Sequence, residues 1–155
     1  CKPRMLVSDS IKNICKAIKK NKKDKVKLIL MNTTANMNRK LQENYSSKDR
    51  FVFSLFTLLL PAHKDNVEAA SYLSNVIGEN NSKIDWVAVR PDTLINEEKV
   101  SEYEIVESIK RSPVFDPGKT SRINVANFIV DLLLNENLWN TWKFRMPVIY
   151  NMESK

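Results

Sequence analysis

Residues 26–31 read Val-Lys-Leu-Ile-Leu-Met (VKLILM), and residues 84–89 read Ile-Asp-Trp-Val-Ala-Val (IDWVAV). Each is a short, nearly continuous apolar run between polar residues, which is typical of a strand in a parallel sheet covered on both faces. Asn32 follows the first run, and Arg90 follows the second. We therefore expect two adjacent parallel strands whose carboxyl ends open onto the same edge of a sheet.

Helical patterns precede and separate the two runs. Between them, one helix is predicted from Ser46 or Ser47 through Leu60, where Pro61 ends it. It is apolar on nearly all sides, which indicates that other elements or a partner cover it. A second helix is predicted from about Asp65 to Ile77, with Gly78 as its stop. Its inward-facing residues are predicted to be Val67, Ala70, Leu73, Val76 and Ile77. Before the first run, an amphipathic helix is predicted from the spacing of Ile11, Ile14, Cys15 and Ile18, with N-caps available from Ser8, Asp9 and Ser10.

The rest of the chain completes an alternating pattern. Residues 92–120 are predicted to be irregular, with a short strand near 103–106, and a long helix over 123–134 and a short strand at 147–150 follow. This order predicts an α/β fold, a Rossmann-like parallel sheet with flanking helices. Three strands make a thin sheet, and residues 26–31 are apolar enough to lie centrally, so further strands are expected from outside this chain.

Size and charge narrow the function. A chain of 155 residues with 43% hydrophobic content can form one ordinary core, so we expect a single domain. The net charge of +7 is local, because residues 1–27 hold ten Lys or Arg against two Asp. These basic residues are not interleaved with aromatic ones and match no nucleic-acid-binding motif. We therefore expect a solvated helix face and no nucleic-acid partner.

Other classes of site find no support. Cys1 and Cys15 have no spacing typical of a disulfide framework, which favours a reducing, cytoplasmic location. The longest apolar run, residues 51–60, is too short to cross a membrane, and the N-terminus does not resemble a signal peptide. One histidine and two cysteines cannot form a closed zinc site, so no metal is expected.

Two features near the C-terminus are predicted to be structural. Gly118 and Lys119 lack the upstream glycine of a phosphate-binding loop, so Thr120 or Ser121 is expected to cap the following helix and Arg122 to anchor it. The aromatic side chains there are expected to pack at the closing edge of the domain rather than to stack on bases. They are Trp139, Trp142 and Tyr150.

Five segments in order resemble consecutive blocks of one family, the atypical, NAD(P)-binding branch of the short-chain dehydrogenase/reductases related to flavin-reductase-like and nitrogen-regulator-like members. The resemblance covers essentially the whole chain. Its most specific parts are the asparagine-rich loop after the first strand, the Val-Arg-Pro-Asp exit from the second, and the Gly-Lys-Thr-Ser-Arg-Ile-Asn-Val entry to the last helix. The segments are VKLILMNTTANMNRK (26–40), LLLPAHKDNVEAASYL (58–73), IDWVAVRPDTLI (84–95), VFDPGKTSRINVANFI (114–129) and LWNTWKFRMPVIYN (138–151).

The resemblance implies a fold whose first half carries a glycine-rich turn that binds the pyrophosphate of NAD or NADP. This sequence has only Gly78 and Gly118, so that fingerprint is absent. Residues 1–155 are therefore expected to be the C-terminal portion of a single NAD(P)-binding Rossmann domain, with roughly 90 residues of it ahead of Cys1.

The resemblance also implies which residues face the cofactor. The loop after the family's fifth strand bears a Ser or Thr near the reactive carbonyl, where Thr33 and Thr34 stand here as candidate catalytic residues. The alternative is that both hydroxyls only satisfy loop backbone. Residues 90–94, after the next strand, match a segment that lies along the nicotinamide in extended relatives. The alternative is that these residues form an ordinary proline turn that ends the strand. The predicted cofactor-binding residues are Asn32, Thr33, Arg90, Pro91, Asp92, Thr93 and Leu94.

One departure from the family weakens a catalytic role. Most members use a Tyr and a Lys four residues later as a proton-transfer pair. Aligning the helix by its exit to the second strand places Ala62 and Asn66 at those positions, so the pair is missing. His63 is a candidate catalytic proton donor with Asp65 orienting it, and the alternative is an exposed or capping role for both.

The sequence therefore predicts a cytoplasmic NAD(P)-dependent oxidoreductase that reduces or epimerises an unidentified small substrate by hydride transfer. The rival hypothesis is a non-catalytic sensor that binds the dinucleotide and reports it to a protein partner. The missing Tyr/Lys pair favours the sensor, and the Thr33 and Thr34 loop favours the enzyme. A homodimer is a candidate assembly for either.

Overall fold

The two apolar runs form the centre of the fold. The computed structural model describes residues 5–21, 24–43 and 45–152. In it, β1 (Val26–Met31) pairs in parallel with β2 (Ile84–Pro91), in a register that runs from Val26 opposite Ile84 to Met31 opposite Val89. The prediction of two adjacent parallel strands is therefore confirmed, and β2 continues two residues further than the sequence predicts.

The sheet has the order β1-β2-β6-β4. β6 (Val148–Asn151) runs parallel to β2, and β4 (Tyr103–Val106) runs antiparallel to β6. Two strands that the sequence did not predict, β3 (Thr93–Ile95) and β5 (Lys119–Ser121), form a separate parallel pair. All eight residues of β2 are buried, whereas β1 is mostly half-buried. In the described part of the chain β1 is thus an edge strand, and the second neighbour that its sequence predicts from outside this chain stays a prediction.

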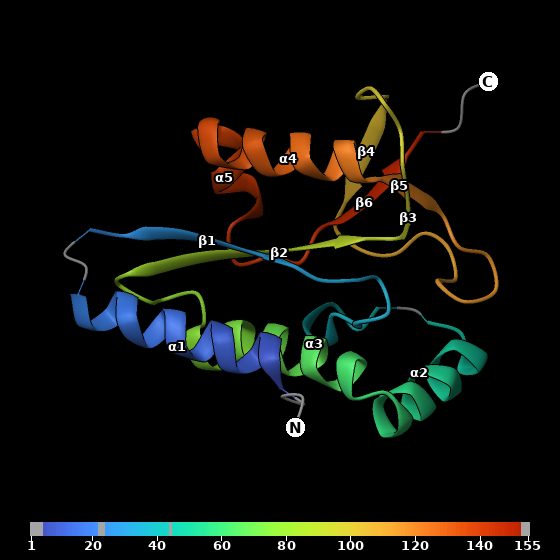
Figure 1. Cartoon of the computed structure of the whole chain (residues 1–155), viewed down its shortest axis with the longest axis horizontal. Helices are drawn as coiled ribbons and strands as arrows, with labels where there is room; N and C mark the ends of the chain where they lie inside the picture. The colour runs from blue at the N-terminus through green and yellow to red at the C-terminus, as the bar shows by residue number, and fades with distance from the viewer. Residues whose placement is uncertain (1–4, 22–23, 44, 153–155) are drawn as a thin grey trace.

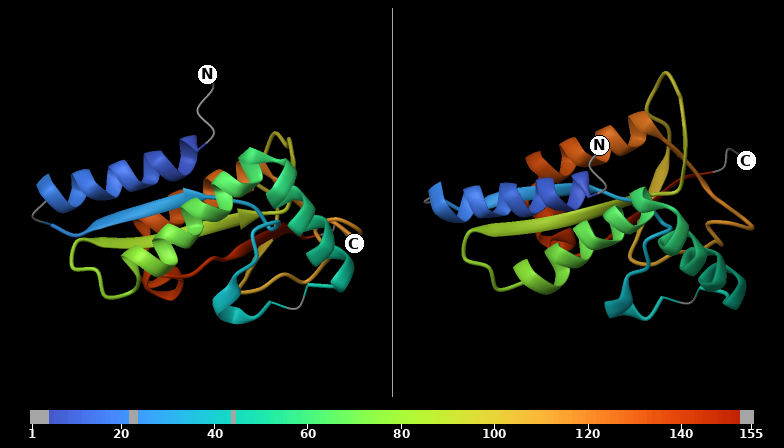
Figure 2. Two further views of the ribbon diagram at one scale, coloured as in Figure 1. Left: turned by 90° about the horizontal axis from the view of Figure 1, so that it is seen from below. Right: turned by 60° about the horizontal axis from the view of Figure 1, so that its bottom comes forward.

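Helices cover both faces of the sheet (Figure 1). One face carries α1 (Leu6–Asn21), α3 (Pro61–Ser71) and the π-helical turn η2 (Tyr72–Ile77), and the other carries α4 (Arg122–Leu134) and α5 (Glu136–Trp142). The views in Figure 2 show α1 and α3 side by side over the same face. The alternation of side chains along β2 supplies both cores, because Trp86 and Ala88 pack beneath α1 and α3 while Val87 and Val89 pack beneath α4.

Three helix predictions need correction. The second predicted helix begins four residues earlier, at Pro61, since proline is favourable at the first helical position. Val76, predicted to face inward, is 61% exposed, because η2 shifts the helical register before Gly78 ends it at φ 68°. α5 was not predicted as a separate helix. It begins where Asn135 interrupts α4 and caps the next helix through a bond from the Leu138 amide.

The N-cap prediction for α1 is also wrong, and the reason is tertiary. The helix begins at Leu6, so Ser8, Asp9 and Ser10 lie inside its first turns. The carboxylate of Asp65, on α3, accepts the amides of Val7 and Ser8 at 2.8 Å each. Asp65, 57 residues from Ser8 in the sequence, therefore accepts the hydrogen bonds of the first helix amides, a role that a local N-cap side chain would otherwise have.

α2 (Ser47–Leu59) follows the short helix η1 (Arg39–Leu41) and begins as predicted, with the Ser46 hydroxyl accepting the Asp49 amide. Phe53 is its buried apolar anchor. Other apolar side chains of this segment are exposed. No described element covers them, so cover by a partner stays a prediction. They are Phe51, Leu55, Leu58, Leu59 and Leu60. Within the described part of the chain, no helix is both long and apolar enough to span a lipid bilayer.

Candidate functional site

Three parallel strands end at one edge of the sheet, which we call the carboxyl edge. The amides of Asn32 and Thr34, just after β1, donate to the carbonyls of Val89 and Pro91 on β2, at 2.7 and 3.3 Å. Pro91 is paired with Ile149 of β6, so the residues that follow each of them lie level with one another. The sequence-predicted segments after β1 and β2 are therefore adjacent, and β6 brings Tyr150 to the same edge.

The loop after β1 holds the predicted reactive hydroxyls. The Asn32 side chain accepts the Thr33 amide at 2.9 Å and donates to the carbonyl of Asn66 on α3 at 3.0 Å. The Thr33 hydroxyl accepts the amide of Ala35 at 3.3 Å, and its residue remains half-buried. Thr34 is 2% exposed. Thr33 is therefore the hydroxyl of this pair that lies near the surface, and Thr34 lies inside the loop.

Arg90 is fully buried beneath this loop rather than at its surface. Its guanidinium makes two parallel hydrogen bonds to the Glu43 carboxylate, at 2.7 and 2.8 Å, and neither side chain is exposed. The same group donates to the carbonyls of Asn36 and Met146 at 3.0 and 2.8 Å. Arg90 thus ties the loop after β1 to the sheet. Sequence reasoning missed Glu43, because 47 residues separate it from Arg90 and no local pattern connects them.

Asp92 lies at the carboxyl edge directly after β2. Its carboxylate accepts the amides of Thr93 and Gly118, at 2.8 and 3.1 Å. Burial raises the pKa of Asp92 above its ordinary value, although these amides and a hydrogen bond with the Thr34 side chain act in the opposite direction. Asp92 therefore links the loop after β1 to the segment that enters β5. Pro91 is buried at the end of β2, whereas Thr93 is exposed and Leu94 half-buried in β3.

His63 lies at the start of α3, and Asp65 does not orient it. The His63 ring stacks on Phe53, with ring centroids 6.1 Å apart, and burial lowers the pKa of His63. Asp65 instead caps α1. Burial alone would raise the pKa of Asp65, but the hydrogen bonds from the Ser8 and Val7 amides outweigh burial and hold this pKa below its ordinary value. The capping interpretation is thus confirmed for Asp65, though it caps another helix.

A cavity of about 730 Å³ connects His63 with the loop after β1. Asn36 and Met37 line it from the loop, and Phe53 and Leu58 line it from α2. The Asn36 Nδ2 is buried and donates to no described residue. A buried amide N–H without an acceptor is costly, so a ligand oxygen or a water would stabilise it. The wall of this cavity thus contains His63, the candidate acid, and Asn36, which carries the unused donor, whereas Thr33 does not line it.

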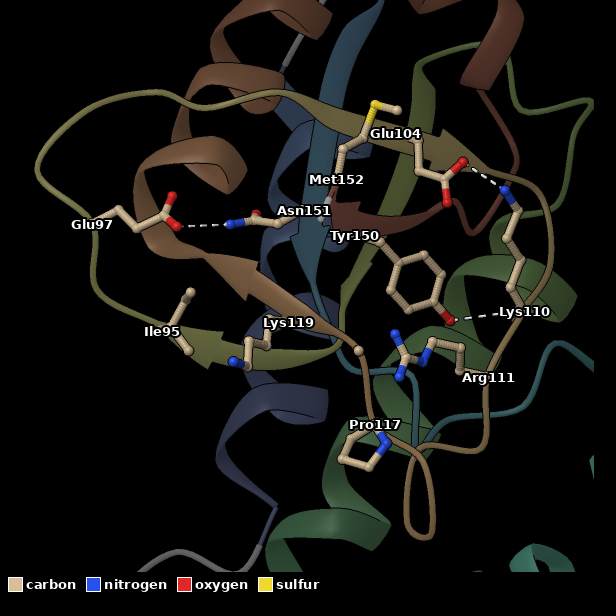
Figure 3. A pocket seen from close by; sticks show the side chains of 11 residues that line it. Ile95, Glu97, Glu104, Lys110, Arg111, Pro117, Lys119, Tyr150, Asn151 and Met152 are labelled. Carbon is tan, nitrogen blue, oxygen red and sulfur yellow. Dashed lines mark hydrogen bonds and ion pairs between the residues drawn. The ribbon is translucent and has the colours of Figure 1, made fainter. Parts of the chain in front are cut away.

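A second cavity, of about 900 Å³, lies at the β6 end of the carboxyl edge (Figure 3). Tyr150 lines it, with its ring directly beside Gly118, where an added Cβ would lie 2.5 Å from Tyr150 Cδ1. The sequence predicts only a packing role for Tyr150. Tyr150 is indeed only 4% exposed, but it lines a cavity and its hydroxyl accepts the Lys110 amide at 3.3 Å. Gly118, one of only two glycines, was the available signal.

The predicted cap of α4 and the predicted packing of Trp139 are confirmed. The Ser121 hydroxyl accepts the Asn124 amide at 3.2 Å and so caps α4, while Arg122 donates to the Asn96 side chain at 2.7 Å. Trp139 is 2% exposed and packs in the core beneath α4. Among the described residues, no group of three or more His, Cys, Asp or Glu side chains is arranged to hold a metal ion.

Comparison with protein families finds a match to the NAD(P)H-binding family over residues 3–136. The match spans α1, the loop after β1, the exit from β2 and all of α4. No curated protein matches the sequence.

Comparison with solved structures finds the same kind of fold. A short-chain dehydrogenase/reductase from Veillonella parvula, solved with NADP, superposes with a TM-score of 0.60 at 16% identity, over 93% of this chain and 58% of that one. A proposed NADH-flavin reductase from Streptococcus pneumoniae gives 0.65 at 14% identity, over 96% and 65%. ChuY, an anaerobillin reductase from Escherichia coli O157:H7, gives 0.54 at 16%, over 83% and 52%. This chain therefore spans less than two thirds of the length of each.

Proposed function

Because this chain belongs to the NAD(P)H-binding family, we propose that it serves an NAD(P)-dependent oxidoreductase of the atypical short-chain dehydrogenase/reductase type. The reaction is hydride transfer between the dinucleotide and an unidentified small substrate. The observation that carries the proposal is the position of the loop after β1: it bears Thr33, lines the His63 cavity through Asn36 and Met37, and lies beside the end of β2 at the carboxyl edge. Ligands of open α/β sheets bind outside the carboxyl ends of the strands.

The residues at this edge fit the nicotinamide end of the cofactor. Asn36 Nδ2 is a buried donor that needs an acceptor oxygen, and Thr33, three residues earlier in the same loop, offers a half-buried hydroxyl. Thr93 is exposed beyond Asp92 and can contact a ligand from the β2 side. The bound cofactor would supply the hydride. With no glycine-rich fingerprint in these residues, the proposal assigns only this end of the dinucleotide to this chain.

The chain's own groups would position the substrate through hydrogen bonds. The Thr33 hydroxyl can hydrogen-bond a substrate oxygen, and the Arg90–Glu43 pair holds its loop in place from below. His63 has a pKa lowered from an ordinary value of about 6.5, so its imidazole is neutral near pH 7 and donates through one N–H. The buried Arg90 acts as a positioning residue and not as a contact to the cofactor.

The proposal is tested with the purified protein. NADPH and NADH binding is measured by nucleotide fluorescence, and turnover is measured against quinones, flavins and carbonyl compounds. Thr33→Val is expected to lower kcat/KM about tenfold or more, because a hydrogen bond to a reacting oxygen contributes roughly 1.5 kcal/mol or more. Thr141→Val is the matched control, since that hydroxyl bonds only its own helix, at the Asn137 carbonyl. Equal loss in both variants, or no dinucleotide binding at all, would reject the proposal.

A sensor that binds the dinucleotide without turnover is the second candidate. Ala62 and Asn66 occupy the positions of the family's catalytic pair, and the Asn66 carbonyl is bound to Asn32, as expected for a structural contact. Tight NADPH binding with no oxidation in any substrate panel would support the sensor. Turnover that Thr33→Val reduces would exclude it.

A further inference from the structure

The cavity at the β6 end of the carboxyl edge contains a hydroxyl with an unused hydrogen. The Tyr150 oxygen accepts the Lys110 amide at 3.3 Å, so this contact does not use its own proton. No described residue accepts a hydrogen bond from it. Figure 3 shows the Tyr150 side chain extending into the cavity with its hydroxyl turned toward Lys110 and Arg111. A nearly buried donor in this position suits an acceptor oxygen on a ligand.

The charges around the cavity favour an anionic acceptor. Its lining includes three basic and two acidic side chains. Lys110 pairs with Glu104 at 2.5 Å, and Glu97 accepts hydrogen bonds from Asn151 and Ser101. Lys119, at the start of β5, forms no ion pair with any described residue and remains exposed. The wall therefore presents one ammonium group that a ligand can still neutralise.

The fixed groups on this wall are pre-organised. Gly118 has no room for a side chain, since a Cβ would lie 2.5 and 2.8 Å from two atoms of the Tyr150 ring. The Gly118 amide in turn donates to Asp92 at 3.1 Å. The Tyr150 ring is thus held by the same segment that is tied to the carboxyl edge. A ligand group at Tyr150 is therefore connected, through Gly118 and Asp92, to the carboxyl edge that holds the proposed site of hydride transfer.

We propose that this cavity binds an oxyanion, a carboxylate or a phosphate, of the small substrate, with the Tyr150 hydroxyl and the Lys119 ammonium group as its donors. This inference rests on the proposed function, and it names the substrate class. The remainder of the substrate lies along the apolar part of the lining, formed by Ile95, Pro117 and Met152. Tyr150 and Lys119 are substrate-binding groups, and neither is assigned a role in proton transfer.

The test is a titration of the full-length chain followed by NMR at the amides of Gly118 and Lys110. Benzoate and phenyl phosphate are the anionic probes, and benzamide is the neutral probe of the same shape. We expect one or both anions to bind at least tenfold more tightly than benzamide. Tyr150→Phe is expected to weaken the better anion about tenfold, and Lys119→Met about threefold with loss of salt dependence. Lys16→Met, on the exposed side of α1, is the control and leaves binding unchanged.

The outcomes separate the possibilities. Equal affinity for benzoate, phenyl phosphate and benzamide, or unchanged anion affinity in both Tyr150→Phe and Lys119→Met, overturns the oxyanion site. Displacement of the probe by 2′-AMP assigns the cavity to a cofactor phosphate and also overturns it. NADPH binding is measured on the same samples. Anion binding without NADPH binding removes the proposed function and keeps the oxyanion site, and the reverse result removes only the site.

Discussion

The two ends of the carboxyl edge are built differently. At β1 and β2, the loop is fixed from below by the fully buried Arg90–Glu43 pair. At β6, the charged groups stand around an open cavity, and the Arg111–Asp116 pair is exposed, with 38% and 63% of the side chains accessible. One end of the carboxyl edge thus has an arginine–carboxylate pair that is shielded from water, and the other end has one that is exposed to it.

This difference indicates a division of labour. A buried ion pair in good geometry fixes a loop strongly, because separating it leaves an uncompensated charge in the interior. Exposed pairs contribute little to stability, since water and salt compete for both partners. The β1–β2 end is therefore suited to positioning, and the β6 end is suited to exchanging its partners for a ligand.

The largest expected effect is at the buried pair. Glu43→Gln leaves the Arg90 charge unpaired and is expected to lower the free energy of unfolding by about 3–5 kcal/mol. Chemical denaturation of the variant and the wild type measures this change. A variant as stable as the wild type would remove the claim that this end of the edge is fixed by the ion pair.

The double variant Arg90→Met with Glu43→Leu is the control, and it keeps the test informative where Glu43→Gln does not fold. It removes both charges together, so most of the lost stability should return. Its loop after β1 should nonetheless bind NADPH less well, because Arg90 no longer donates to the Asn36 carbonyl.

An intermediate effect is expected at the β6 end. Gly118→Ala forces a methyl group against the Tyr150 ring and should cost about 1–3 kcal/mol, with displacement of that ring. Gly78→Ala is the matched control, because nothing lies within 4 Å of its added Cβ and only its φ of 68° opposes the change. Anion titration should respond to Gly118→Ala alone. An equal response to both variants would mean that the cavity senses global stability and not the position of Tyr150.

The smallest effect is expected at the exposed pair. The Arg111 hydrogen bond and charge hold the pKa of Asp116 below its ordinary value. Asp116→Asn should nevertheless leave the thermal unfolding midpoint unchanged within error, since the pair is in water. A clear fall in the midpoint would show that the two ends of the edge do not differ as described.

Much of the fold could be predicted from local patterns. The bounds of β1, the cap of α2 at Ser46 and the stop at Gly78 follow from apolar runs and capping residues that act within a few positions. The cap of α1 could not be found in this way, because Asp65 reaches it from another helix. β3 and β5 were also missed, since each is three residues long and has little pattern of its own.

The candidate site was predicted only in part. Thr33, Thr34 and Asp92 could be placed at one edge because parallel strands end together. Arg90 was assigned to the same surface, and its burial became visible only with Glu43 in place. Tyr150 looked like packing because a single aromatic residue in a short strand carries no directional signal.

The sequence by itself determined β1 and β2, their parallel pairing and the edge at which they end, because hydrophobic periodicity and capping act between neighbours in the chain. Only the tertiary structure decided which polar residues face that edge and which lie beneath it. Contacts such as Arg90 with Glu43, or Gly118 with Tyr150, join positions far apart in sequence, and their geometry depends on the packing of the whole sheet.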